Sequence, residues 1–406
     1  MKKPMQPLPA GVTNRRSFLK KGAAAAGAVT MSAGLLSNAP YARAHDDDDS
    51  RPLTRGDIAI LRFLQALETI EADLWRQYAE LGGATTQPNA SPIDLPFPTG
   101  LAPAYITGLI QLDGDMPQYI ADNTDDELSH ESFLRNYLED KGVESADLTP
   151  FKNITPSQVT GVPGDLRLTN LTQLTVDTSW WTRYRSDNMN PDFGDTFPNA
   201  IPTLGVLQHT AIPRNNNDLI IDPTQPNGIG AFTQAIASTA GFHFAFIEQG
   251  GTSLYPQLAQ RVTHPEVLRI LLSIGPTETC HFQTWHDKAG NAAQPPLAPL
   301  TVKDPVTGVS VTFPNLDDPT HTAAQADALQ ANLIMPEPTI FLNRKFGTVS
   351  IIRPTETKDA AKNAVKSLVD DGLFLGHTSK KGKSDGFVEK LFDLAAAADE
   401  ARRESF

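Results

Sequence analysis

The sequence contains only one cysteine, Cys280, among 406 residues, so no disulfide can form within the chain. Long apolar runs are also missing: outside an Ala- and Gly-rich stretch near the N-terminus, no segment is apolar enough to span a bilayer. Positive charge is scarce, and the net charge is −13. Because so acidic a chain binds nucleic acid and anionic membranes poorly, we expect neither as a partner.

Acidic residues are absent from the first 44 positions, which carry seven basic residues. The segment Asn14–Lys20, with Arg15 and Arg16 at its centre, resembles a twin-arginine export signal. An Ala- and Gly-rich run follows, and Ala42-Arg43-Ala44 supplies a cleavage site. We therefore expect the twin-arginine machinery to export the chain to the periplasm or the extracellular space. Cleavage would leave a mature protein of net charge about −20, without a stable membrane span.

Apolar residues recur at helical spacing in four long segments. Glycine pairs predict the ends of the first and third helices, at positions 82–83 and 250–251. Asn123-Thr124 could interrupt the second helix, and Gly275-Pro276 should kink or split the fourth. The four predicted helices span about residues 53–81, 115–141, 229–249 and 265–289.

The helical segments predict a mainly α-helical domain over residues 50–292, with a long irregular insertion at about 143–228. Residues 293–406 form an irregular extension with extra C-terminal helices; an unrelated second domain from about residue 300 is the alternative. Within this extension we predict short strands at 309–313 and 348–352 and helices at 358–371 and 384–403.

The pattern Glu-x-x-His occurs twice, as Glu127–His130 in the second helix and Glu278–His281 in the fourth. Three residues rotate a helix by about 300°, so both side chains of each pair leave the same face. Two such helices, each partnered by a helix that carries a Glu, can hold two iron or manganese ions. Cys280 lies between Glu278 and His281, so it either approaches the metal or is a small buried thiol.

The first helix offers two further carboxylates, Glu68 and Glu71, on an otherwise apolar stripe. A carboxylate that faces a core is costly unless it is paired or bound to a metal. We predict that at least one of them is a ligand. A dinuclear site needs such acids, because anionic oxygens must separate two divalent ions.

The chain resembles the ferritin-like superfamily, and within it the exported proteins related to desiccation-associated proteins. Leu67–Ala72 is similar to the first helix of that group, and Asp126–Leu134 is similar to the second. The resemblance implies a ferritin-like four-helix bundle in up-down-up-down order, with one long crossover between helices two and three. It also implies a dinuclear iron or manganese site that reacts with oxygen or peroxide.

The third helix departs from the family pattern, because Ala240 stands where the family has a glutamate. Glu248, two turns further on, or His243, one turn away, could supply the missing ligand. If neither does, the site would be mononuclear, altered or empty.

These observations leave three functions open. The first is an exported oxidoreductase with a dinuclear metal site that acts on oxygen or peroxide. The second is a structural or stress-protective envelope protein that keeps the bundle without metal. The third is a binding module in which Trp180 and Trp181 of the insertion contact a ligand.

Overall fold

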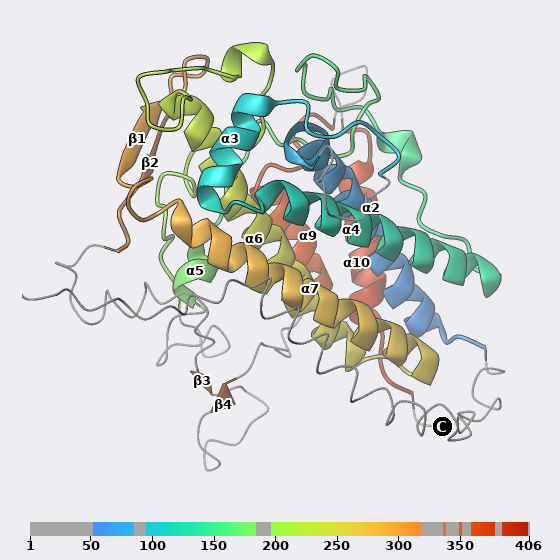
Figure 1. The fold of residues 1–406 in the computed structure, drawn as a ribbon. Helices are drawn as coiled ribbons and strands as arrows, with labels where there is room; N and C mark the ends of the chain where they lie inside the picture. The colour runs from blue at the N-terminus through green and yellow to red at the C-terminus, as the bar shows by residue number, and fades with distance from the viewer. Residues whose placement is uncertain are drawn as a thin grey trace, which may run out of the picture. The chain divides into compact units, whose positions relative to one another are not determined.

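The computed structural model describes most of the chain from Pro52 onward (Figure 1). The export segment predicted at residues 1–44 lies outside the described residues. Helices dominate, which confirms the prediction of a mainly α-helical chain. Within the described ranges, every helix is too short or too polar to cross a bilayer. These ranges are residues 52–84, 95–183, 196–317, 336–337, 349–350, 359–377 and 384–404.

Helix α2 (Arg55–Gly82) begins with a capping box. The Thr54 hydroxyl accepts a hydrogen bond from the Asp57 amide at 3.1 Å, and the Thr54 amide donates to the Asp57 carboxylate at 3.2 Å. These bonds satisfy amides that a helix start otherwise leaves unpaired. Asp57 also accepts from the Thr263 amide, which fixes the start of α2 against the turn between two later helices.

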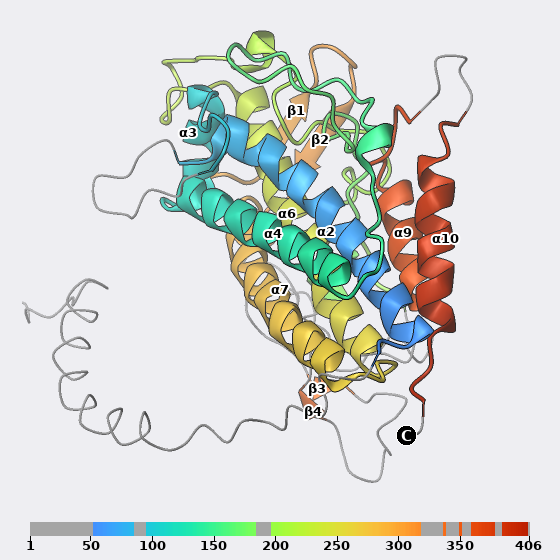
Figure 2. The ribbon, with the colours of Figure 1, turned by 90° about the vertical axis from the view of Figure 1, so that its right-hand side faces the viewer.

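Helix α4 (Met116–Asp140) packs along α2, and the two lie side by side in both views of the chain (Figures 1 and 2). The break considered at Asn123-Thr124 does not occur. The Thr124 hydroxyl donates to the Ile120 carbonyl at 2.6 Å within the helix and reaches the Trp75 carbonyl of α2 at 3.2 Å. The polar pair therefore fits a continuous helix because its side chains find partners there.

Helices α6 (Ala231–Ala259) and α7 (Pro265–Asn291) form the second closely packed pair. The predicted end at Gly250-Gly251 is wrong, since α6 continues to Ala259, and α7 runs unsplit through Pro276. Close packing explains why glycines lie inside these helices. A Cβ at Gly275 would meet the Cβ of Tyr255 at 2.8 Å, so the two helix backbones approach where glycine removes a side chain.

Helix α3 (Pro103–Leu112) was not predicted. It packs on α6, where a Cβ at Gly108 would meet the Cβ of Ala237 at 2.9 Å. Its sequence is short and apolar nearly all round, so it shows little of the one-sided periodicity that marks a surface helix. Proline in its first turn was the available signal.

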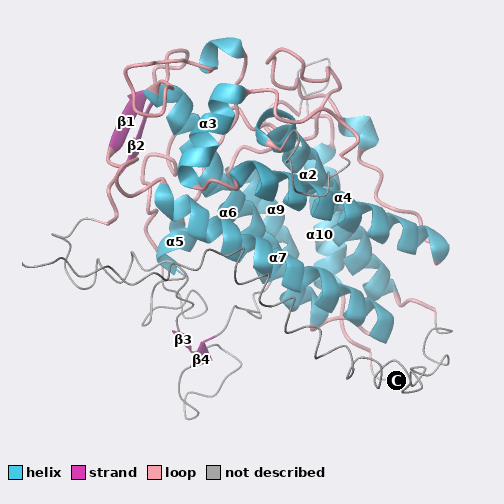
Figure 3. Cartoon of the chain, in the orientation of Figure 1, coloured by secondary structure: helices cyan, strands magenta, loops and turns pink. Residues whose placement is uncertain are grey.

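The predicted insertion after α4 is irregular, as Figure 3 shows by its long loops. Its regular pieces are short: η1 (Thr149–Phe151), α5 (Ser179–Arg183) and η3 (Asn216–Asp218). Buried polar bonds hold it against α2. Asp73 accepts from the amides of Leu168 and Thr169 at 2.9 and 3.0 Å, and Arg167 forms an ion pair with Glu80 at 2.8 Å.

Trp180 and Trp181 pack the insertion onto the helices and are only 1% and 3% exposed. Both rings lie about 6 Å, centroid to centroid, from Phe242 of α6, and both contact His286 of α7. Rings so deeply buried offer no face to a ligand. Packing against the helices therefore explains the Trp180-Trp181 pair, on which the binding-module hypothesis depended.

The described parts of the extension after α7 contain two pairs of strands and two helices. Strands β1 (Leu300–Lys303) and β2 (Ser310–Phe313) pair antiparallel, as do β3 (Pro336–Glu337) and β4 (Val349–Ser350). Helices α9 (Ala360–Asp370) and α10 (Phe387–Glu400) confirm the two predicted C-terminal helices. They pack on each other, α10 contacts α2 and α9 contacts α6, so the extension covers one side of the long helices (Figure 2).

Candidate metal centre

Six of the eight predicted ligands come together where the four long helices pack. Helix α2 contributes one carboxylate and α6 another, while α4 and α7 each contribute a Glu-x-x-His pair. All four carboxylates are at most 1% exposed. The six residues are Glu68, Glu127, His130, Glu248, Glu278 and His281.

The six side chains form two groups, each of which can hold a metal ion. Within each group, one ligand atom from every residue lies within 4.8 Å of the others. Glu127 and Glu278 belong to both groups. Glu68 and His130 complete the first group, and Glu248 and His281 complete the second.

His130 shows the geometry of the first group most clearly. Its Nδ1 lies 3.3 Å from a Glu127 oxygen, 3.3 Å from a Glu278 oxygen and 3.4 Å from a Glu68 oxygen. One ring nitrogen carries one proton, so it cannot hydrogen-bond well to three oxygens. Ligands bonded to one ion at about 2.1 Å lie about 3.0–3.4 Å apart, and these spacings match.

His281 occupies the corresponding place in the second group. Its Nδ1 lies 3.1 Å from Glu127 and 3.2 Å from Glu248. Its other nitrogen, Nε2, lies 3.0 Å from the Asp126 carboxylate. A carboxylate on the far nitrogen fixes the orientation of a ligating imidazole and increases its basicity. Asp126 was not among the predicted site residues, although it begins the segment Asp126–Leu134 that carries the family resemblance.

The four buried carboxyl groups and two imidazoles lie so close together that each shifts the pKa of its neighbours. Burial and repulsion from Glu248 raise the pKa of Glu127 to about 7. Burial and the Glu127 charge raise the pKa of Glu278 well above its ordinary value. Burial acts to lower the pKa of His130, but its contacts with the surrounding carboxylates outweigh this and raise it. The site therefore retains protons that a bound cation would displace.

Several oxygens of the cluster are buried without a hydrogen-bond donor. Both carboxylate oxygens of Glu278 and one of Glu68 are in this state. Leaving a buried acceptor unpaired costs about 1–3 kcal/mol. A Cβ at Gly251 would lie 2.5 Å from a Glu278 oxygen, so glycine is needed for this carboxylate to reach the cluster. Carboxylate oxygens that converge in this way, and that share the single His130 Nδ1 at 3.3–3.4 Å, fit a cation.

Asn123 holds two of the acids and was missed as a site residue. Its amide nitrogen donates to Glu127 at 2.9 Å and to Glu248 at 3.0 Å, while its oxygen accepts from the Trp285 indole at 2.6 Å. Asn123 precedes Glu127 by four residues, so helical spacing places both on one face. That spacing was the signal that could have found it.

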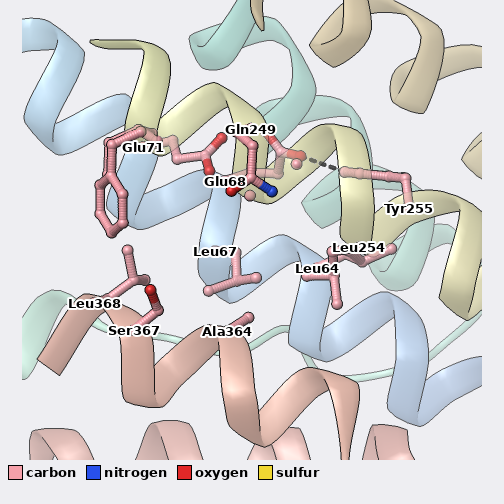
Figure 4. A pocket seen from close by; sticks show the side chains of 14 residues that line it. Leu64, Leu67, Glu68, Glu71, Gln249, Leu254, Tyr255, Ala364, Ser367 and Leu368 are labelled. Atoms are coloured by element: carbon pink, nitrogen blue, oxygen red, sulfur yellow. Dashed lines mark hydrogen bonds between the residues drawn. The ribbon is translucent and has the colours of Figure 1, made fainter. Parts of the chain in front are cut away.

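Tyr255 supports the cluster from α6, and it too was missed. Its hydroxyl donates a hydrogen bond to Glu68 (Figure 4). Tyr255 follows Glu248 by seven residues, about two helical turns, so both side chains lie on the same face. The signal was hidden because Gly250-Gly251, between them, predicted the end of the helix.

The other two predicted ligands, Glu71 and His243, lie outside the two groups. Glu71 is half-buried one turn beyond Glu68, where burial and the surrounding carboxylates raise its pKa well above its ordinary value. His243 contacts the Tyr78 hydroxyl at 2.7 Å and the Asp371 carboxylate at 3.0 Å, so both ring nitrogens have protein partners. Five residues separate His243 from Glu248, which places them about 140° apart around α6.

Cys280 does not lie in the site. It is exposed, which corrects both sequence expectations, proximity to the metal and a buried thiol. Its two neighbours in the motif face inward, and a residue between them on a helix must leave by another face.

The arrangement can thus bind metal through buried oxygen and imidazole donors contributed by four helices. Comparisons of the chain with protein-family models, with curated proteins and with solved structures find no match.

Proposed function

We propose that α2, α4, α6 and α7 form a ferritin-like four-helix bundle that holds a dinuclear iron or manganese site. One observation carries the proposal: the two buried ligand groups share Glu127 and Glu278. Two shared carboxylates are what a pair of divalent ions requires, because each acid places anionic oxygen between the ions. The ligand set of a Glu from each of two helices and a Glu-x-x-His from the other two follows the ferritin-like pattern.

The donor set suits iron, manganese or zinc, and the ferritin-like pattern uses iron or manganese. Four carboxylates and two imidazoles suit such ions, whereas soft metals prefer sulfur, and the only cysteine points elsewhere. Four carboxylate charges would also balance two divalent cations.

We further propose that the exported protein is an oxidoreductase that acts on oxygen or peroxide. Bound iron or manganese would supply a reversible change of oxidation state. The chain's own residues would hold the geometry: Asn123 fixes Glu127 and Glu248, and Asp126 orients the His281 ring. Burial excludes bulk water and strengthens every electrostatic contact in the site.

The alternative is a metal-free structural or stress-protective envelope protein. It was motivated by Ala240, which stands where the family has a glutamate. In the structure the Glu248 carboxylate joins the cluster from the same helix. The missing glutamate at position 240 therefore does not by itself argue for a metal-free protein.

Metal content tests the proposal. We expect the mature protein, loaded with Fe²⁺ or Mn²⁺ and then desalted, to carry two ions per chain by elemental analysis. The double substitution His130→Ala with His281→Ala should reduce this to near zero. Ser129→Ala with Cys280→Ala is the matched control, because these exposed residues each adjoin one of the histidines. Equal metal content in the two double variants would reject the proposal.

A further inference from the structure

A cavity of about 70 Å³ adjoins the metal centre on the side covered by the C-terminal extension (Figure 4). Leu67 of α2 and Leu254 of α6 form part of its wall, and Ala364 and Leu368 of α9 close the opposite side. The ferritin-like pattern does not include α9. The cavity is therefore built partly by a segment outside the four proposed bundle helices.

The size of the cavity limits what it can hold. Its volume is about that of two water molecules in the liquid and about half of a cavity that binds benzene. A molecule of about two to four non-hydrogen atoms matches this volume.

The chemistry of the wall limits the ligand further. Most of the lining is apolar, and its polar side chains are Glu68, Glu71, Gln249, Tyr255 and Ser367. The Gln249 amide nitrogen already donates to the Ser253 hydroxyl at 2.8 Å. None of the described residues that line the cavity is Lys or Arg. An anion would be desolvated there and repelled by the nearby acids, and the few polar side chains offer little to replace the water shell of an ion. An uncharged, mainly apolar molecule remains.

The cavity reaches the metal centre through shared residues. Glu68 lines it and belongs to the first ligand group, with one oxygen 3.4 Å from His130 Nδ1. The Tyr255 hydroxyl, which also lines the cavity, donates to the other Glu68 oxygen. Gly251 lies in the wall as well, and its missing side chain gives room to Glu278 of the cluster. A molecule in the cavity would thus lie directly behind Glu68, one of the proposed metal ligands.

We propose that this cavity binds a small, uncharged, mainly apolar molecule, such as dioxygen or an alcohol of two or three carbons, next to the metal centre. Binding depends only on the cavity, whereas the role of the molecule as a reactant rests on the proposed function. The proposal narrows the substrate class by excluding anions, and it gives α9 a role in forming the site.

Methyl NMR on the full mature chain tests the binding, with leucine methyl groups labelled and xenon as an apolar probe. We expect saturable shifts of the Leu67, Leu254 and Leu368 methyls with xenon. 1-Propanol should compete with xenon, and propionate, its anionic counterpart of similar size, should not. Xenon binding without competition by propanol would assign the cavity to apolar gases such as dioxygen alone. Shifts absent from these leucines, or competition by propionate equal to that by propanol, would overturn the proposal.

Substitutions on α9 locate the binding. Ala364→Phe should fill the cavity and weaken xenon binding at least tenfold, while Lys366→Phe, at an exposed position on the same helix, should leave it unchanged. If Ala364→Phe unfolds the chain, Ser367→Trp at the exposed rim provides a second block. Unchanged binding in a folded blocked variant would contradict the proposal.

Metal content separates this inference from the proposed function. Both phenylalanine variants should still take up two ions per chain, because neither position belongs to the ligand groups. A wild-type chain that binds xenon at these leucines and takes up no metal would overturn the dinuclear site and the reactive role of the ligand, while supporting the cavity as a binding site.

Discussion

Helix α2 carries buried carboxylates in two different settings. Asp73 and Glu80 have protein partners: Asp73 accepts three hydrogen bonds from Leu168 and Thr169, and Glu80 is paired with Arg167. Glu68 instead joins three other acids that have no Lys or Arg partner among the described residues. Buried acids with a structural role, such as Asp73 and Glu80, thus find their hydrogen-bond and ion-pair partners within the chain. Where the chain leaves oxygens of Glu68 and Glu278 without a hydrogen-bond donor, the proposed site would place a cation.

The largest expected effect is the loss of stability when Glu80, an acid with a structural role, loses its ion-pair partner Arg167. Arg167→Met should destabilise the fold by about 3 kcal/mol, because Glu80 would lose its buried partner and keep only the partly exposed Arg76. Glu127→Gln should leave the metal-free chain as stable or make it more stable, because it removes one of several acids that repel each other. Urea unfolding of both metal-free variants measures this contrast. A larger loss of stability for Glu127→Gln would contradict it.

The pH dependence of stability is the next largest effect. The pKa of Glu127 is raised from 4.5 to about 7, so the folded chain retains a proton that the unfolded chain loses between these values. The metal-free protein should therefore lose about 3 kcal/mol of stability as pH rises from about 4.5 to 7. The raised pKa of His130 acts in the same direction above about pH 6.5.

Urea unfolding of the metal-free chain at pH 5, 6, 7 and 8 measures this slope. Metal affinity should change in the opposite direction and rise with pH, because bound ions displace the retained protons. Stability of the metal-free chain that rises between pH 5 and 7 would contradict the proposed coupling. Glu127→Gln should flatten the profile.

The smallest expected effect is the difference between alanine substitutions at two adjacent glycines of α6, Gly250 and Gly251. A side chain at Gly251 would strike the Glu278 carboxylate, whereas one at Gly250 would meet nothing within 4 Å. Gly250→Ala should stabilise the fold by about 0.5–1 kcal/mol and preserve metal binding. Gly251→Ala should lower metal affinity, which titration with Mn²⁺ measures. Equal affinities in the two variants would show that the close approach to Glu278 does not matter.

Much of the fold could be predicted from the sequence, because the long helices have one clearly apolar side. Their predicted ranges match α2, α4 and α7 closely, and both C-terminal helices were found. The end of α6 was misplaced because Gly250-Gly251 resembles a helix stop. Tertiary packing against α7 overrides that local signal, and the sequence alone does not contain the packing partner.

The site could be predicted where ligands share one helix, and less well where they come from different helices. Fixed helical spacing placed each histidine beside its glutamate. The choice between Glu248 and His243 stayed open because it depends on how α6 is rotated against its neighbours. In the structure His243 faces Tyr78 and Asp371, and Asp371 belongs to a segment 128 residues later in the chain. No local pattern reveals such a partner.

Anomalous X-ray diffraction from crystals of the mature chain grown with Mn²⁺ tests the central claim most directly. The account predicts two peaks about 3.5–4 Å apart, one beside His130 and one beside His281, with Glu127 and Glu278 between them. No peak among these side chains, or manganese bound only elsewhere on the chain, would contradict it.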